Sequence, residues 1–279
     1  MSVELSETLH ALRRTVADLT ASVPGEDGRL VSFGVASLDQ ALAGGLACAA
    51  LHEIGPAAPL QGGAATGFAM ALAARTLGGR SQAVWIQPDF TVIEAGALYG
   101  PGLDLMGLPM GRLVILRVPR PRDALWAMEE ALKCRAVGAV VAELAREEAD
   151  LTATRRLALA AREGGGLGLV LHPNLAASQP FCSQSFCSQP STATTRWEVA
   201  SARGARDCFG GLGPTTFALS LVKNRRGRTG QWRLSWDHHE CAFATSLSFP
   251  VAPAARNGSP CNELLRDPSP RAQRRMRAG

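Results

Sequence analysis

The chain has 279 residues, of which 46% are hydrophobic and 19% are charged, so it holds enough apolar material for one sizeable core. No apolar run is long enough to cross a bilayer and the start of the chain lacks a signal-peptide pattern, so we expect a cytoplasmic protein with no membrane partner. The formal charge is +5, and the seven cysteines show no zinc-ligand spacing, so we expect no metal site.

An amphipathic helix is predicted at the start of the chain, within residues 1–25. Apolar residues recur there at intervals of four and three and form a single stripe: Leu5, Leu9, Leu12, Val16 and Leu19. Such a stripe packs on the protein's own core or docks on another subunit, and the sequence leaves both options open.

An α/β domain is predicted over residues 26–247. From Leu51 onward short apolar runs alternate with helix-prone stretches, which is typical of a parallel sheet covered by helices. The predicted strands lie near residues 51–54, 83–86, 112–118, 138–142 and 167–171, and the predicted helices span 68–77, 122–135 and 151–162. Because crossovers are right-handed, we expect a doubly wound, mainly parallel sheet with helices on both faces.

Two antiparallel strands are predicted after a long Ser/Gln/Thr-rich loop that runs from His172 to about Thr195. Apolar residues alternate with polar or small ones at 217–221 and at 232–236. The turn between these runs is basic, and its cations are Lys223, Arg225, Arg226 and Arg228.

A disordered basic tail is predicted at residues 248–279. The stretch from Val251 holds six arginines against two acids, so the rest of the chain is close to neutral. Four of these arginines cluster at its end: Arg271, Arg274, Arg275 and Arg277. Such a tail suits phosphate backbones or an acidic partner, or it only solubilises the protein.

A motif precedes the first strand of the predicted sheet. The chain reads FGVASLDQALAGGL from Phe33 to Leu46 and LHEIGP from Leu51 to Pro56. This order resembles the RecA/RadA lead-in, in which a strand ending in Gly-Pro runs into a phosphate-binding loop. The resemblance implies a RecA-like fold. In an ATP-binding member the loop reads G-x-x-x-x-G-K-[ST], where backbone N–H groups and the lysine hold the phosphates and the hydroxyl holds magnesium.

The corresponding loop is degenerate in this chain. Residues 55–67 read GPAAPLQGGAATG, and neither lysine nor arginine occurs between Gly55 and Arg75. The remnants of the loop are Gly55, Gly62, Gly63, Thr66 and Gly67. Since charge-assisted contacts are the strong ones, we expect no tight ATP binding, no catalysis and no bound cofactor. Weak anion binding at residues 62–67 stays open, because the helix dipole survives there.

The resemblance also implies roles for residues at the ends of other strands. Asp89 follows the second strand, where the family has a carboxylate that activates water, and Glu143 replaces the magnesium-linked aspartate of the fourth strand. The alternative is that both acids only cap strand ends or accept backbone N–H groups. Lys223 and Arg225 match a RecA block whose cations reach the ATP of the neighbouring subunit, unless they form a solvated tip.

Three further stretches, WIQP from Trp85, EAGALYGP from Glu94 and GQWRLSWD from Gly230, resemble the ImuA family. The resemblance covers roughly residues 30–240. It implies a bacterial accessory factor of the SOS response that acts with an ImuB-like Y-family polymerase homologue and an error-prone replicative-type polymerase in mutagenic translesion synthesis. Such a factor would associate with the nucleoid upon DNA damage.

On this resemblance we expect a non-catalytic adaptor between RecA or DNA and an error-prone polymerase in DNA repair. Two alternatives stay open. One is an ATP-binding, RecA-like, DNA-dependent ATPase with an unusual loop. The other is a single-stranded DNA-binding protein that uses the basic turn and the arginine-rich tail, whose affinity would fall steeply with salt.

Overall fold

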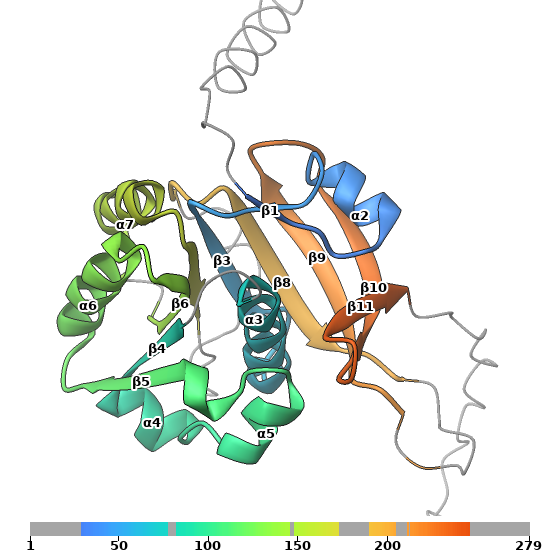
Figure 1. Ribbon diagram of the computed structural model, residues 1–279, viewed down its shortest axis with the longest axis horizontal. Coiled ribbons are helices and arrows are strands. Elements are labelled where there is room, and N and C mark those ends of the chain that lie inside the picture. Colours follow the sequence, from blue (N-terminus) through green and yellow to red (C-terminus); the bar gives the residue numbers. More distant parts are fainter. Residues whose placement is uncertain are drawn as a thin grey trace, which may run out of the picture. The chain divides into compact units, whose positions relative to one another are not determined.

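The computed structural model describes residues 29–77, 82–145, 148–172, 190–204, 211 and 213–245. The predicted N-terminal helix, the predicted basic tail and most of the predicted loop after His172 lie outside this part of the chain. Within it, helices and strands form an α/β arrangement around one large sheet (Figure 1), which confirms the predicted α/β class. No described helix is long and apolar enough to span a membrane.

The large sheet has nine strands in the order β11-β10-β9-β8-β3-β7-β6-β4-β5. They are β3 (Ala50–Pro56), β4 (Gln82–Pro88), β5 (Leu113–Val118), β6 (Val137–Glu143), β7 (Leu167–Leu171), β8 (Thr195–Ser201), β9 (Thr216–Asn224), β10 (Gly230–Asp237) and β11 (Ala242–Thr245). Neighbours from β5 to β8 are parallel, whereas β8 to β11 are antiparallel. The sheet is therefore mainly parallel, as predicted.

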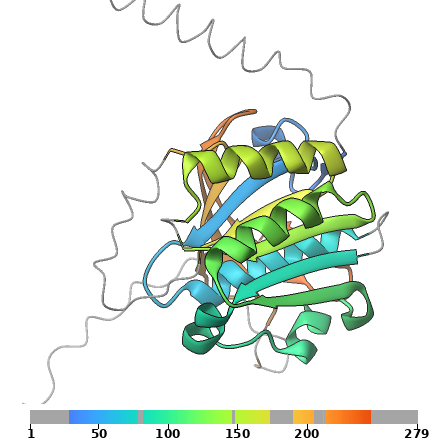
Figure 2. The same ribbon diagram turned by 90° about the vertical axis from the view of Figure 1, so that its left-hand side faces the viewer.

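Helices cover both faces of this sheet. They are α2 (Ala36–Ala41), α3 (Gly62–Thr76), α4 (Asp89–Ala95), α5 (Gly100–Leu105), α6 (Pro121–Lys133) and α7 (Leu151–Gly164), with a short 3-10 turn at Met110–Arg112. Phe68 and Leu72 of α3 belong to one apolar core, and Met128 of α6 and Leu157 of α7 belong to another. Figure 2 shows α6 and α7 together on one side, which agrees with the prediction of helices on both faces.

Strands β6 and β7 form in the middle of the parallel part because their sequences are almost wholly apolar on both faces. All seven residues of β6, VGAVVAE, are buried, as expected for a strand covered on both sides. The covering helices carry one apolar stripe each, such as Ala124, Met128 and Leu132 in α6. Gly164 ends α7 so close to α6 that a Cβ there would lie 1.8 Å from the Leu132 carbonyl oxygen. Only glycine fits this approach.

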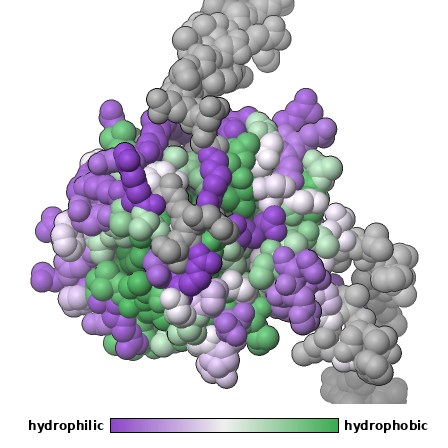
Figure 3. All heavy atoms as spheres, in the orientation of Figure 1, coloured by the Kyte–Doolittle hydropathy of each residue, from purple (hydrophilic) through white to green (hydrophobic). Residues whose placement is uncertain are grey.

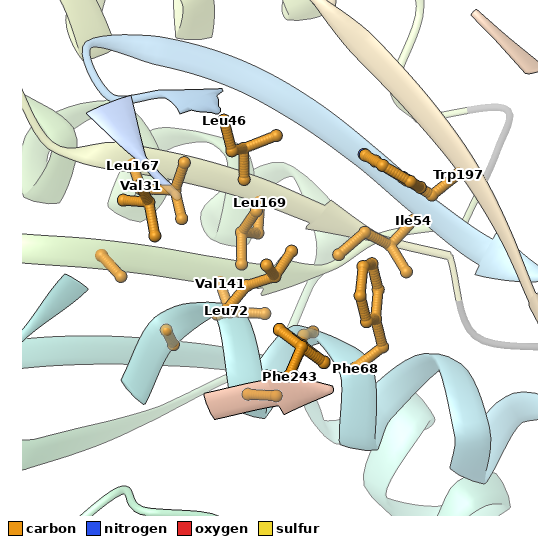
Figure 4. Packing of buried hydrophobic residues seen from close by; sticks show 14 of the residues in the cluster. Val31, Leu46, Ile54, Phe68, Leu72, Val141, Leu167, Leu169, Trp197 and Phe243 are labelled. Carbon is orange, nitrogen blue, oxygen red and sulfur yellow. The ribbon is translucent and has the colours of Figure 1, made fainter. Parts of the chain in front are cut away.

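Helix α3 packs closely on the sheet because it is rich in alanine. Figure 4 shows its Phe68 and Leu72 against Ile54, Leu169 and Trp197 of the strands. The Phe68 and Trp197 rings are 5.6 Å apart by their centroids, a distance typical of favourable aromatic pairs. This packing fixes the start of α3 beside the end of β3.

The predicted lead-in motif folds into a small unit of its own. Strands β1 (Leu30–Val31) and β2 (Leu46–Ala47) pair antiparallel on either side of α2. The Asp39 carboxylate accepts hydrogen bonds from the Ser32 hydroxyl and from the backbone N–H groups of Phe33 and Gly34. Gly45 has φ +138°, and a Cβ there would lie 2.8 Å from the Val31 carbonyl oxygen. The aspartate and the glycine of the motif are therefore needed for the turn and for the close pairing.

Candidate functional site

Three of the positions marked by the sequence meet at one edge of the sheet, together with His172. Strands β3, β7, β6 and β4 are parallel neighbours, so their carboxyl ends lie side by side. Gly55 lies near the end of β3, His172 follows β7, Glu143 ends β6 and Asp89 follows β4. In open α/β sheets this edge is the usual place for a ligand. We call it the carboxyl edge.

The loop between β3 and α3, residues 57–61, is attached to the neighbouring strand β8. The Ala57 N–H donates to the Val199 carbonyl oxygen at 2.8 Å. The Gln61 side-chain oxygen accepts two bonds from Ser201, one from the backbone N–H and one from the hydroxyl, each at 2.8 Å. Leu60 has φ +65° and is 92% exposed. The Gln61 N–H also donates to the Ala58 carbonyl oxygen, at 3.2 Å. Two backbone donors of the loop and the Gln61 side-chain oxygen are thus bonded within the chain.

The remaining loop candidates lie inside a helix. Helix α3 begins at Gly62 and not at Phe68, so Gly62, Gly63, Thr66 and Gly67 occupy its first turns instead of a loop. The Thr66 hydroxyl, the candidate for magnesium, donates back to the Gly62 carbonyl oxygen at 3.1 Å. This local bond satisfies the hydroxyl without a ligand.

The first cation after Gly55 is engaged elsewhere. Arg75 lies at the far end of α3, where its guanidinium donates to the carbonyl oxygens of Ser32 and Cys241. It ties α3 to the lead-in unit and to the start of β11. The carboxyl edge at the loop therefore receives no positive side chain from residues 55–75.

Glu143 is a buried acid at the carboxyl edge, and its described partners are neutral. One of its carboxylate oxygens accepts from the indole N–H of Trp85 at 2.8 Å and from the side-chain amide of Gln87 at 2.9 Å. Burial raises the pKa of this carboxyl above its ordinary value, although both hydrogen bonds act in the opposite direction. The sequence marked Trp85 and Gln87 only as part of a family-like stretch and not as partners of Glu143, because they come from another strand.

Asp89 differs from Glu143 because it is exposed. It is the first residue of α4, where a negative charge interacts favourably with the helix dipole. The structure places both acids at the same edge, yet one is exposed on a helix start and the other is buried among neutral donors.

A buried ion pair lies at the centre of the sheet, and sequence reasoning missed it. Arg196 of β8 donates to the Glu53 carboxylate of β3 at 2.6 Å, and both residues are only 2% exposed. The two positions are 143 residues apart in the chain, so no local pattern links them. On the other side of Arg196, β9 places Lys223 opposite it.

The basic turn lies at the opposite edge of the sheet. Strand β9 runs antiparallel to β8 and ends at Asn224, so the turn that follows lies at the edge where the parallel strands begin, across the sheet from the loop after β3. We call this the amino edge. The amine of Lys223 and the guanidinium of Arg225 both donate to the Ser191 carbonyl oxygen, at 2.7 Å and 2.9 Å. Arg226 and Arg228 are exposed. The two predicted sets of site residues are thus separated by the length of a strand.

Lys223 has an unusual protonation equilibrium. Burial, and next the charge of Arg225, lower its pKa from 10.5 to about 8.

Two further sets of candidates lie outside the described residues and stay predictions. They are the apolar stripe of the predicted N-terminal helix (Leu5, Leu9, Leu12, Val16 and Leu19) and the tail arginines (Arg271, Arg274, Arg275 and Arg277).

A shallow hollow of about 440 Å³ lies on the face of β8, β9 and β10, beside Ala57. Small and polar side chains line much of it, including Ala200, Ala218, Ser220 and Gln231. None of the site residues predicted from the sequence lines it.

Comparison with known proteins identifies relatives of the chain. No family model matches it. Two curated proteins, both named Protein ImuA and each from a different strain of Caulobacter vibrioides, are 34% identical to it over 210 residues. The match covers 74% of this chain and 82% of each relative. It extends well beyond the lead-in motif and the loop, so the likeness concerns the domain as a whole. The chain belongs to the ImuA family.

Proposed function

We propose that this protein is a non-catalytic accessory factor of SOS-induced mutagenesis, an adaptor that brings an error-prone polymerase to RecA or to DNA during translesion synthesis. The observation that carries this proposal is the state of the loop after β3. Its Ala57 N–H and its Gln61 side-chain oxygen are bonded to β8, and no cation lies between Gly55 and Arg75. Family membership supplies the biological setting.

The domain is, on this proposal, a RecA-like fold with a degenerate phosphate-binding loop. The support is positional. A strand that ends in Gly55-Pro56 leads through a short loop into a helix, and the ends of the neighbouring parallel strands carry Glu143 and Asp89. A triphosphate at this site would meet the two acids, and the loop after β3 would supply no lysine or other cation to bind it. Such a site lacks the positive charge that holds a triphosphate tightly.

The amino edge supports docking on RecA. Its cations and the degenerate loop lie on opposite edges of one sheet, roughly 20 Å apart for a strand of this length. Two such edges meet in a head-to-tail contact between neighbouring subunits. A protein that presents Lys223 and Arg225 at one edge can bind an ATP-loaded RecA protomer. Because its other edge holds no nucleotide, no further RecA subunit can add to it, and the filament ends there. It would cap or remodel the end of a filament and recruit the ImuB-like protein and its replicative-type polymerase there.

Co-purification tests this function. The full chain is mixed with RecA and ATP, and separately with the ImuB-like protein and the error-prone polymerase of the same organism. We expect both captures, and we expect Lys223→Ala with Arg225→Ala to lose RecA but keep the polymerase complex. Lys133→Ala, which removes a cation paired with Glu129 and Glu130 on α6, is the matched control. Undiminished RecA capture by the double variant would exclude the amino edge as the docking face.

Single-stranded DNA binding is a second candidate, favoured by the exposure of Arg226 and Arg228 at the basic turn. Contacts of this type are mainly electrostatic, so the affinity falls as salt rises. DNA binding at low salt is compared for the full chain, for Arg226→Ala with Arg228→Ala, and for deletion of residues 251–279. If neither change lowers the affinity, the basic turn and the tail are excluded as the main DNA contacts.

A further inference from the structure

Strand β5 ends the sheet with an apolar edge. It is the last strand in the order of the described sheet and pairs only with β4. Alternate N–H and C=O groups of such a strand point away from its one neighbour and can pair with an added strand. Val114 is 50% exposed, Ile115 39% and Leu116 38%. Three consecutive aliphatic side chains thus lie on an edge whose backbone has free pairing capacity.

Further apolar side chains are exposed on the elements that flank β5. Trp126 of α6, the helix that packs on β4 and β5, is 64% exposed. Phe90 and Ile93 of α4 are also exposed. In Figure 3 hydrophobic spheres gather on the part of the surface where Figure 1 places β5. A group of this kind on a folded protein marks an interaction site more often than chance exposure.

Strand β5 has few of the features that usually prevent an edge strand from pairing with another chain. Protected edges carry charged side chains along the strand, a proline or a bulge. The only charged residue of β5 is Arg117, next to its end, and the register between β4 and β5 is regular, whereas the register between β4 and β6 shifts at Gln82. The edge is therefore suited to receive a strand.

Positive charge surrounds the apolar segment. Residues 112–122 hold four arginines and no acid. Arg117, Arg120 and Arg122 are exposed, and Asp123 offsets only Arg120, at 3.5 Å. Arg112 donates to the Leu77 carbonyl oxygen. The rim of the β5 edge thus favours a partner with negative flanks.

We propose that the β5 edge, defined as Val114, Ile115 and Leu116 with the rim arginines Arg117 and Arg122, binds an extended segment of a partner protein that carries alternating apolar residues between acidic flanks. The segment adds a tenth strand to the sheet. Its apolar residues meet Val114 and Leu116 on the face covered by α6, because alternate residues of a strand share one face. Its acids meet the rim arginines. The proposal rests on the adaptor function and names the chemistry of the protein that is recruited.

A second copy of this chain fits the edge less well. Antiparallel pairing of β5 with itself would offer the rim arginines no acid, because residues 112–122 hold four arginines and no acid in either copy, and an interface with only positive charge disfavours association. The charge of the rim therefore selects a different, acidic chain.

The test uses the full chain and two fluorescent synthetic peptides of alternating valine and threonine, one with glutamates at both ends and one with lysines. We expect the glutamate peptide to bind about tenfold more tightly than the lysine peptide. Val114→Glu with Leu116→Glu should weaken that binding by at least about tenfold, since two apolar contacts are lost. Leu151→Glu with Leu159→Glu, which alters exposed leucines of α7, should bind like the unchanged protein. Circular dichroism verifies that each variant is folded.

A charge exchange makes the test sharper. Arg117→Glu with Arg122→Glu should reverse the preference, so that the lysine peptide binds more tightly. Equal binding of the glutamate peptide by the unchanged protein and by the Val114→Glu, Leu116→Glu variant overturns the proposal. So does a concentration-dependent dimer in sedimentation that this variant abolishes, because a second copy would then fill the edge.

The same variant separates this proposal from the adaptor function. If the unchanged chain captures the polymerase partner and the Val114→Glu, Leu116→Glu variant captures it equally well, the adaptor function stands and the β5 edge is not its docking site. If the unchanged chain captures no partner while the glutamate peptide still binds at β5, the adaptor function fails and the edge is a peptide site.

Discussion

Two buried acids of the sheet have opposite surroundings. Glu53, in the middle of β3, is paired with Arg196 at 2.6 Å, whereas the described hydrogen-bond donors to Glu143, at the end of β6, are the neutral side chains of Trp85 and Gln87. A buried charge is tolerated when it is paired and bonded, and it shifts towards its neutral form when it is not. The interior charge of Glu53 is paired and therefore serves the fold, whereas Glu143 at the carboxyl edge has neutral described donors and no described cation as a partner.

The largest effect is expected from breaking the interior pair. Arg196→Met leaves the Glu53 carboxylate buried and unpaired, so the free energy of unfolding should fall by about 3–5 kcal/mol. Urea denaturation measures this change. The double variant Glu53→Leu with Arg196→Met should recover most of the loss, because no unpaired charge remains. A single variant that costs less than about 1 kcal/mol would show that water reaches Glu53.

A smaller effect is expected at Glu143. Glu143→Ala leaves the Trp85 indole and the Gln87 amide without their acceptor, which should cost about 2–3 kcal/mol. Glu143→Gln keeps an acceptor oxygen and removes the charge, so it should be as stable as the unchanged protein at neutral pH, or more so. Equal losses in both variants would mean that the charge itself is needed.

The pH dependence of the Glu143 variants follows from the raised pKa. The folded protein holds this proton more tightly than the unfolded chain, so its contribution to stability is complete in acid and is lost as the pH rises through the raised pKa. The advantage of Glu143→Gln over the unchanged protein should therefore grow from acid to neutral pH. Chemical denaturation at a series of pH values measures it.

The smallest effect concerns Lys223, which lies opposite Arg196 beside the interior pair. Its pKa is lowered from 10.5 to about 8, so the folded protein binds fewer protons than the unfolded chain between these values. The free energy of unfolding should rise across that interval, by about 1 kcal/mol once the partial exposure of this side chain is considered. Lys223→Met should remove this rise. An identical profile in the variant would place the titration elsewhere.

The sequence predicted the parallel part of the sheet well, because buried strands read as apolar runs. The strand at 167–171 coincides with β7, and the others are found within a few residues. The start of α3 was predicted too late because Gly62 and Gly63 resemble a loop. Strand β8 was missed because its polar residues, including Arg196, are buried only through a partner far along the chain.

The candidate site was predictable in part. Motif order located Glu143 and Asp89 at the carboxyl edge, since that order follows the strands of a parallel sheet. The contacts that define their chemistry arise between strands and leave no local pattern. The edge strand β5 was predicted as a strand, yet its position at the end of the sheet, and hence its exposure, depends on the strand order.

Calorimetric titration of the full chain with ATP and magnesium, combined with an assay for released phosphate, tests the central claim most directly. The account predicts no binding at micromolar concentrations and no turnover, because the loop after β3 offers no cation and part of its hydrogen-bonding capacity is used within the chain. Micromolar affinity with hydrolysis that is abolished by Gly62→Val and Gly63→Val would contradict it.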